Sequence, residues 1–240
     1  MNIQDLAGEN LQVLAHNPYP GRWIVMGRTP DGDPVQIYCT MGRGAGSRNR
    51  VLKPVPDKHG WLETKLADPS RSTNDPNLLY TAMAEQDGAF IVSNGAQTNA
   101  VVNGGILALK EGWQYESDEP TYTPRITGRI QMRGNTMDLR MIMLRKSPFG
   151  NGCDYLDYSY NEVAGGYGYF FSTYLENDDP PPSFRGEPLI VPIEGTDPDQ
   201  IVKNFWSILN EDNRVSIAVK VITPGHPSET SIFNKYAEVI

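Results

Sequence analysis

Short apolar runs separated by turn residues are the feature that most limits how this chain can fold. Residues 22–27 form one compact apolar run, and residues 35–41 alternate in part between apolar and polar side chains, with Pro30, Asp31 and Gly32 between the two runs. Proline, aspartate and glycine favour tight turns, and alternation favours a half-buried strand. We therefore expect a β-hairpin near the amino terminus.

A second hairpin is expected around Gly134 and Asn135. Residues 126–132 precede this turn, and residues 137–144 follow it with apolar and polar side chains largely in alternation. Further strands are expected at residues 89–93, 167–174 and 215–221.

Three segments carry helix signals. Asp75-Pro76 and Asp197-Pro198 each place an N-cap aspartate before a proline, and apolar residues at helical spacing follow them to residues 83 and 209. Residues 98–111 are also expected to be helical, although Gly104 and Gly105 each cost about 1 kcal/mol relative to alanine inside a helix. The polar stretch 54–75 is expected to be mainly loop.

Several hairpins combined with a few separated helices predict an α+β fold with largely antiparallel sheets, rather than regular βαβ repetition. The chain has 240 residues and no internal repeat. One hydrophobic core usually serves a chain of up to about this length, so a single domain over residues 1–240 is expected and two small domains are the second choice.

The charge limits the classes of partner. A net charge of -8 would repel nucleic-acid phosphates over most of the surface. The amino terminus has no basic region followed by an apolar core, and no stretch approaches the length of a membrane span. We expect a cytoplasmic protein with neither a nucleic-acid nor a membrane partner, so that any anion site must be local.

Such a local site is suggested by Arg43, Arg48 and Arg50, which lie in a segment without acidic residues. The glycine-rich turn at residues 42–47 fails as a dinucleotide fingerprint and as a P-loop. Its backbone amides and the guanidinium groups can nevertheless hold phosphate oxygens. The residues alone leave a phosphate site and a solvated basic loop equally open.

Other candidates are weaker. The three histidines are scattered and the two cysteines have no metal-ligand spacing, so we expect no metal site. Cys39 is interpreted as a small buried residue rather than a nucleophile. Tyr115, Glu116 and Arg125 place a phenol, a carboxylate and a guanidinium in one loop-like segment, which composition alone would assign to a surface turn.

Five motifs in one order carry a family resemblance. They are NPYPGR at residues 17–22, the segment from Tyr38 through MGRGAGSRNR, VSNGAQT at residues 92–98, YESD followed by YTPRITG at residues 115–128, and YFFSTYLENDDPPPSF at residues 169–184. Together they resemble the archaeal-type IMP cyclohydrolases. The resemblance implies a four-layer αββα sandwich similar to that of N-terminal-nucleophile hydrolases but without self-cleavage, and the start Met1-Asn2-Ile3 agrees because it offers no nucleophile.

The resemblance also implies a reaction, the closure of the formyl-carboxamide imidazole nucleotide FAICAR to IMP with loss of water in purine biosynthesis, without a cofactor. A carboxamide nitrogen attacks a formyl carbon of the same molecule, so the enzyme must fold this purine-precursor nucleotide and move protons. Motif match assigns acid–base work to Tyr38, Tyr115 or Glu116. It assigns substrate contacts to Arg22, Arg43, Ser47, Arg48, Asn49, Arg50, Asn94, Gly95, Asn99, Arg125 and Tyr174.

The chain departs from the archaeal pattern in an insert-like stretch around residues 147–166 and a C-terminal extension from about residue 191. Changed loops around a retained phosphate site could accept another imidazole or purine nucleotide, since function belongs to the site. Two alternatives stay open: a non-catalytic purine-nucleotide-binding or regulatory protein, and an amide hydrolase that uses Cys39. The aromatic stretch 155–174 suits either a core or the interface of a homo-oligomer.

Overall fold

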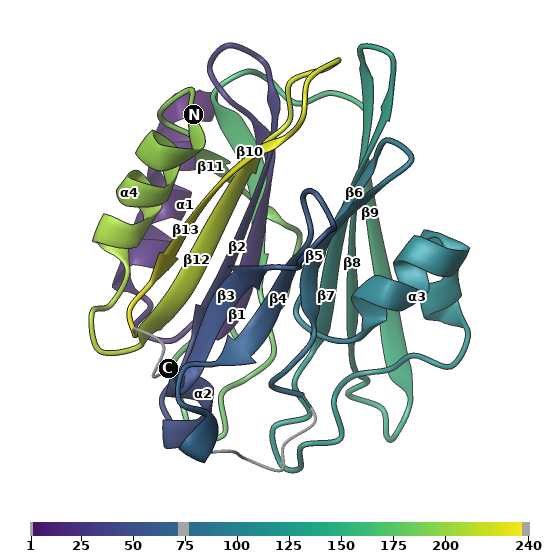
Figure 1. Ribbon diagram of the computed structural model, residues 1–240. Helices are drawn as coiled ribbons and strands as arrows, with labels where there is room; N and C mark the ends of the chain where they lie inside the picture. The colour runs from purple at the N-terminus through teal and green to yellow at the C-terminus, as the bar shows by residue number, and fades with distance from the viewer. Residues whose placement is uncertain (1, 72–76, 237–240) are drawn as a thin grey trace.

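The computed structural model describes residues 2–71 and 77–236. Within these ranges the chain forms two β-sheets that face each other, with helices on their outer sides (Figure 1). The strand pairs of the described residues are all antiparallel. The expected α+β class with antiparallel sheets is confirmed.

The first sheet has the predicted amino-terminal hairpin at its centre. Its strands are β1 (Arg22–Arg28), β2 (Pro34–Met41), β10 (Tyr167–Ser172), β11 (Leu189–Pro192), β12 (Arg214–Val221) and β13 (Glu229–Asn234). They lie in the order β11-β10-β1-β2-β12-β13. Both β1 and β2 are buried along almost their whole length, because helices cover one face of this sheet and the second sheet covers the other.

The second sheet is a meander whose strands follow chain order. They are β3 (Arg50–Pro54), β4 (Leu62–Leu66), β5 (Thr81–Gln86), β6 (Ala89–Ser93), β7 (Arg125–Arg133), β8 (Thr136–Lys146) and β9 (Cys153–Tyr160). The second predicted hairpin is confirmed as β7 and β8. The stretch that appeared insert-like contains β9, which pairs with β8 and forms one edge of the sheet.

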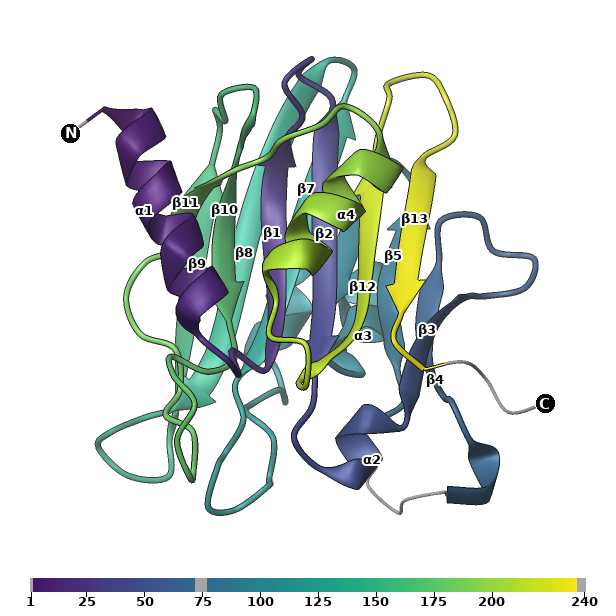
Figure 2. The same ribbon diagram turned by 90° about the vertical axis from the view of Figure 1, so that its left-hand side faces the viewer.

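The helices are α1 (Ile3–His16), α2 (Ala45–Arg48), α3 (Gln97–Gly104) and α4 (Pro198–Ile208), with short 3-10 turns η1 (Pro69–Arg71) and η2 (Ile106–Lys110). Helices α1, α3 and α4 lie on the outer sides of the sheets, whereas the short α2 lies beyond the ends of the strands (Figure 1 and Figure 2). Figure 2 shows α1 and α4 in front of the first sheet, and α3 lies outside the second. The predicted cap of α4 is confirmed, since the Asp197 side chain accepts a hydrogen bond from the backbone of Gln200.

Two helix predictions and one loop prediction are wrong in part. The helix expected from Asp75-Pro76 is strand β5 from Thr81 onward, while its expected start lies outside the described residues. The helix expected over residues 98–111 breaks at Gly105, whose φ is 70°. The stretch 54–75, expected to be loop, contains β4. The helix prediction at β5 failed because a short apolar run is compatible both with a buried interior strand and with a buried helix.

Lys220 is a charged side chain buried between the two sheets. It is 0% exposed, its Nζ donates to the carbonyl of Gly60, and it lies 3.8 Å from Oε2 of Glu85. Burial, only partly offset by Glu85, lowers the pKa of Lys220 from 10.5 to about 8. The unfolded chain therefore binds more protons than the folded chain between these two pKa values, and stability rises with pH in this window.

We expect Lys220→Met to remove this rise in stability. One pKa unit corresponds to about 1.36 kcal/mol, so the free energy of unfolding should rise by about 3 kcal/mol from pH 8 to the ordinary pKa of lysine. Urea unfolding of wild type and variant from about pH 7 to about pH 10.5 measures the difference. Lys203→Met on the exposed side of α4 is the matched control and should keep the rise. An equal rise in Lys220→Met would contradict the assignment.

Candidate functional site

Residues of the sequence motifs meet where strands of both sheets end. Arg22 begins β1, Met41 ends β2, and Arg50 and Arg125 begin β3 and β7. Between these strand ends lies a small pocket of about 120 Å³. This strand-end pocket is lined by Tyr19, Gly21, Arg22, Met41, Ser47, Arg50, Asn77, Leu78, Glu116, Asp118, Thr123 and Tyr174.

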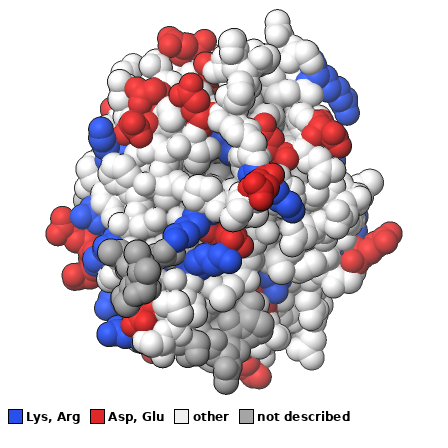
Figure 3. Space-filling view, viewed as in Figure 1, with Lys and Arg blue, Asp and Glu red and all other residues white. Residues whose placement is uncertain are grey.

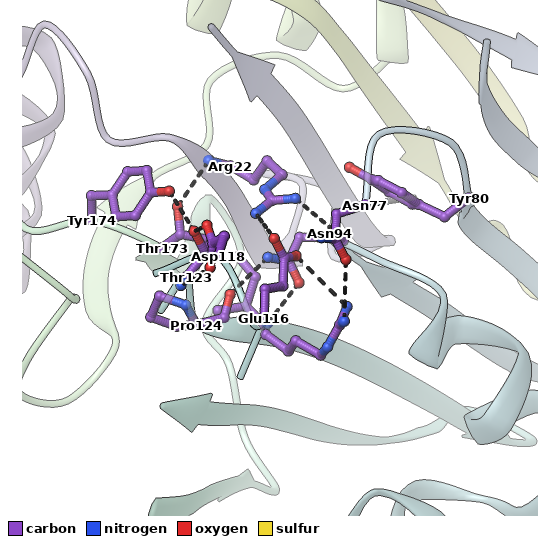
Figure 4. A network of polar contacts seen from close by, with 12 residues as sticks. Arg22, Asn77, Tyr80, Asn94, Glu116, Asp118, Thr123, Pro124, Thr173 and Tyr174 are labelled. Carbon is purple, nitrogen blue, oxygen red and sulfur yellow. Dashed lines mark hydrogen bonds and ion pairs between the residues drawn. The ribbon is translucent and has the colours of Figure 1, made fainter. Parts of the chain in front are cut away.

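A buried carboxylate lies between two arginines at this pocket (Figure 4). Glu116 is 3% exposed, and its Oε2 accepts a hydrogen bond of 3.0 Å from Arg22. Its Oε1 lies 3.6 Å from NH1 of Arg125 and has no hydrogen-bond partner among the described residues. This oxygen keeps its capacity to accept a hydrogen bond or a proton from a ligand.

Burial raises the pKa of Glu116, although Arg22 and Arg125 partly offset the effect. A low-dielectric environment favours the neutral acid, whereas the two guanidinium groups favour the carboxylate. A carboxyl under such opposed influences inside a pocket is typical of an acid–base residue. The surface turn that composition favoured for Tyr115, Glu116 and Arg125 is therefore not observed for Glu116.

Asn94 holds the strand ends that carry these arginines. Its Oδ1 accepts hydrogen bonds from the backbone of Ile126 at 2.8 Å and from Gln97 at 2.9 Å, while its Nδ2 donates to the carbonyl of Pro124 at 2.8 Å. The backbone carbonyl of Asn94 accepts a further hydrogen bond of 3.1 Å from Arg22. The side chain is thus engaged within the protein and does not line the pocket.

Gly95 and Asn99, two further predicted substrate contacts, also lie outside the pocket lining. Gly95 leaves room for Arg125, because a Cβ at this position would lie 2.5 Å from NH1 of that arginine. Asn99 is exposed on α3.

Two residues of the arginine-rich segment 42–50, Ser47 and Arg50, line the pocket. Arg50 is 2% exposed, and its Nε donates to the carbonyl of Ser47 at 2.9 Å. Its NH1 has no hydrogen-bond partner within the described part of the chain. A buried guanidinium with an unused donor at a pocket wall is suited to bind an anion such as a phosphate.

The other predicted residues of this segment have protein partners outside the pocket. Arg43 donates to Asn177 and to the carbonyl of Asp178, and lies over the ring of Tyr19. Arg48 donates to the carbonyl of Gly42 and to Asn213. Asn49 binds the backbone of Asp68 and Arg71. These three side chains shape the loops around the strand-end pocket without lining it.

Neither of the two tyrosines predicted for acid–base work lines the pocket. Tyr38 is fully buried, its hydroxyl lies 2.5 Å from that of Tyr80, and burial raises its pKa. The hydroxyl of Tyr115 donates to the carbonyl of Asn151 at 3.2 Å. Tyr80 was not expected from the sequence, and no motif marked it.

Cys39 is fully buried in β2, as expected. Burial raises the pKa of its thiol, and the thiol lies 3.7 Å from the carbonyl of Thr40 rather than at the pocket. A nucleophilic cysteine needs access to substrate and a thiolate that forms readily. The geometry therefore does not favour an amide hydrolase that uses Cys39.

Asp118 and Thr123 are pocket residues that the sequence analysis did not select. Thr123 Oγ1 donates to Asp118 Oδ2 at 2.5 Å and lies 2.7 Å from the hydroxyl of Tyr174, a predicted substrate contact. Both residues belong to the motifs YESD and YTPRITG. Their polar side chains within those motifs were the signal that could have identified them.

On the face shown in Figure 3, acidic and basic side chains are interspersed rather than gathered into one patch. Within residues 2–71 and 77–236, no three His, Cys, Asp or Glu side chains are grouped to hold a metal ion. No helix in these ranges combines the length and the apolar character needed to cross a membrane.

Fold and site define an α+β protein with a small pocket lined by buried charged side chains. A family model described as IMP cyclohydrolase-like protein matches residues 19–226, and the chain belongs to this family. The predicted family is thereby confirmed.

The chain is also similar to a protein named IMP cyclohydrolase from Methanopyrus kandleri, with 28% identity over 118 residues. The matched segment covers 45% of this chain and 57% of the relative, so it spans little more than half of that protein's length.

Proposed function

We propose that the chain is an IMP cyclohydrolase, which closes FAICAR to IMP with loss of water in purine biosynthesis. The main support for this proposal is the buried Glu116 carboxyl, which lies between Arg22 and Arg125 at a pocket that Arg50 also lines. Family membership and the name of the relative support the same activity. We place the protein in the cytoplasm and propose that its two-sheet fold is of the N-terminal-nucleophile hydrolase kind.

The phosphate end of the nucleotide is assigned to Arg50 and Ser47. Arg50 has an unused guanidinium donor among the described residues, and the Ser47 hydroxyl can turn from the Gly44 carbonyl toward a ligand. Charge-assisted hydrogen bonds of this kind are well suited to hold phosphate oxygens. Arg43, Arg48 and Asn49 support this end of the pocket through the loops that they hold.

The reacting end is assigned to Glu116 with its two arginines. Ring closure places negative charge on the formyl oxygen, and the guanidinium groups of Arg22 and Arg125 stabilise that charge. Burial raises the pKa of Glu116, and in its protonated form Glu116 supplies a proton to the same oxygen. Asn94 and Gln97 position the arginines, and the paired hydroxyls of Tyr38 and Tyr80 support the pocket wall from behind.

Incubation of the purified chain with FAICAR tests the proposal. We expect IMP to form, detected by its absorbance and confirmed by chromatography, well above the rate without protein. Binding of FAICAR without IMP formation would overturn the enzyme proposal and favour the non-catalytic nucleotide-binding protein. Absence of both binding and turnover would exclude FAICAR as the ligand.

A further inference from the structure

Three side chains at the strand-end pocket form a hydrogen-bonded row that leads from a buried wall toward solvent (Figure 4). The hydroxyl of Tyr174 lies 2.7 Å from Thr123 Oγ1, which lies 2.5 Å from Asp118 Oδ2. Tyr174 and Thr123 are buried, whereas Asp118 is half-buried. The row therefore connects the interior of the pocket to a carboxylate that water can reach.

The donors and acceptors give the row a direction. A threonine hydroxyl has a single hydrogen, and an ionised carboxylate only accepts. Thr123 therefore donates to Asp118, and Tyr174 must be the donor to Thr123. The backbone N–H of Thr123 donates to the other carboxylate oxygen of Asp118 at 2.7 Å and fixes its orientation. The Tyr174 oxygen, whose proton is committed to Thr123, keeps acceptor capacity for a ligand.

Tyr174 is held in place from several sides. Its backbone N–H donates to the carbonyl of Pro20 at 3.1 Å, its own carbonyl accepts from the Ser172 hydroxyl at 2.7 Å, and its ring packs against that of Tyr19. A hydroxyl on such a fixed backbone can position a reacting group within the tolerance that catalysis requires.

Resting on the proposed function, we infer that Tyr174, Thr123 and Asp118 form a proton relay that takes one proton from the substrate's carboxamide nitrogen during ring closure. As the C–N bond forms, the N–H proton moves to the Tyr174 oxygen, the Tyr174 proton moves to Thr123, and the Thr123 proton moves to Asp118. The π electrons of the formyl C=O bond become a lone pair on its oxygen, which takes a proton from Glu116. Asp118 then releases its proton to water and Glu116 regains one.

The surroundings of Glu116 and Asp118 agree with their separate roles as proton donor and final proton acceptor. Glu116 faces two guanidinium groups, whereas Asp118 receives hydrogen bonds from the hydroxyl and backbone N–H of Thr123. Burial raises the pKa of Tyr174, so its phenol stays neutral and passes a proton along rather than losing it. Tyr174 is the catalytic residue of the row, and Thr123 and Asp118 are positioning residues that act through it.

The test compares Thr123→Val, which removes the hydroxyl without changing the shape of the side chain, with Thr123→Ser, which keeps it. We expect Thr123→Val to lower kcat for FAICAR about 100-fold with KM little changed, the size of effect typical of one proton-transfer group. Thr123→Ser should restore most of the activity. Thr127→Val is the matched control, because it removes another buried threonine hydroxyl, bonded to Ser93 outside the pocket, and should leave kcat unchanged.

A fall in kcat without a change in KM, together with rescue by Thr123→Ser, separates a relay from a merely structural role. Asp118→Asn removes the last proton acceptor of the row and should likewise lower kcat with KM little changed. A wild-type kcat in Thr123→Val, or a change in KM alone, overturns the relay while leaving the proposed function intact. A wild type that does not convert FAICAR overturns both. If Thr123→Val fails to fold, Tyr174→Phe interrupts the row one residue earlier and the same kcat comparison decides.

Discussion

Glu116→Gln is expected to lower kcat for conversion of FAICAR to IMP by about 10²- to 10⁴-fold, the usual contribution of a general acid. Glutamine keeps the size of the side chain and can still accept the hydrogen bond from Arg22, but it has no proton to transfer. The rate of IMP formation at saturating FAICAR measures the effect. Because the amide also leaves Arg22 and Arg125 without their counter-charge, thermal unfolding of the variant must accompany the kinetics.

Asp157→Asn is the control for this experiment. Asp157 on β9 pairs with Arg140 on β8 at 2.5 Å, and neither residue lines the pocket, so the same change of carboxylate to amide should leave kcat unaltered. A folded Glu116→Gln protein with wild-type kcat would show that Glu116 is not the acid. A rise in KM without a fall in kcat would assign Glu116 to substrate binding instead.

The elements that the sequence predicted correctly have signals within a few neighbouring residues. The two hairpins, at residues 22–41 and 126–144, combine apolar runs with turn residues, and helix α4 has the Asp197 cap. Such features act over a few residues, so they do not depend on the rest of the fold.

The elements that were missed or mistaken depend on tertiary contacts. Helix α1 leaves Ile3 and Val13 exposed and packs Leu14 into the core, so its apolar pattern is too weak to stand out before the sheet is known. Strand β5 reads as a helix because Ala82, Met83 and Ala84 are all buried in an interior strand covered on both faces.

The sequence predicted which motifs contribute to the site, but not which side chains of each motif point into the pocket. Tyr115 and Glu116 are neighbours in one motif, yet Tyr115 contacts the carbonyl of Asn151 whereas Glu116 contacts Arg22. Likewise Arg48 and Arg50 are two residues apart, and only Arg50 lines the pocket. Side-chain direction follows from backbone conformation, which short α2 and the start of β3 set here, and motif spacing does not contain that information.

Arg22→Met is expected to lower the free energy of unfolding by about 3 kcal/mol or more, because it leaves the buried Glu116 carboxylate with only the longer contact to Arg125. It also removes the donor to the Asn94 carbonyl. Urea unfolding at neutral pH measures the loss. Arg140→Met is the matched control, since it breaks the more exposed pair with Asp157 and should cost no more than about 1 kcal/mol.

The double variant Arg22→Met with Glu116→Gln distinguishes the ion pair from simple packing. Much of the cost of Arg22→Met comes from the uncompensated charge of Glu116, so neutralising that residue should recover about 1–3 kcal/mol relative to the sum of the two single losses. Strictly additive losses would mean that the Arg22 side chain stabilises the fold through its packing alone. A recovery would show that the two charges stabilise each other in the folded chain. A double variant at least as stable as the wild type would show that the charged pair is kept at a cost, as expected for groups retained for chemistry at the pocket rather than for stability.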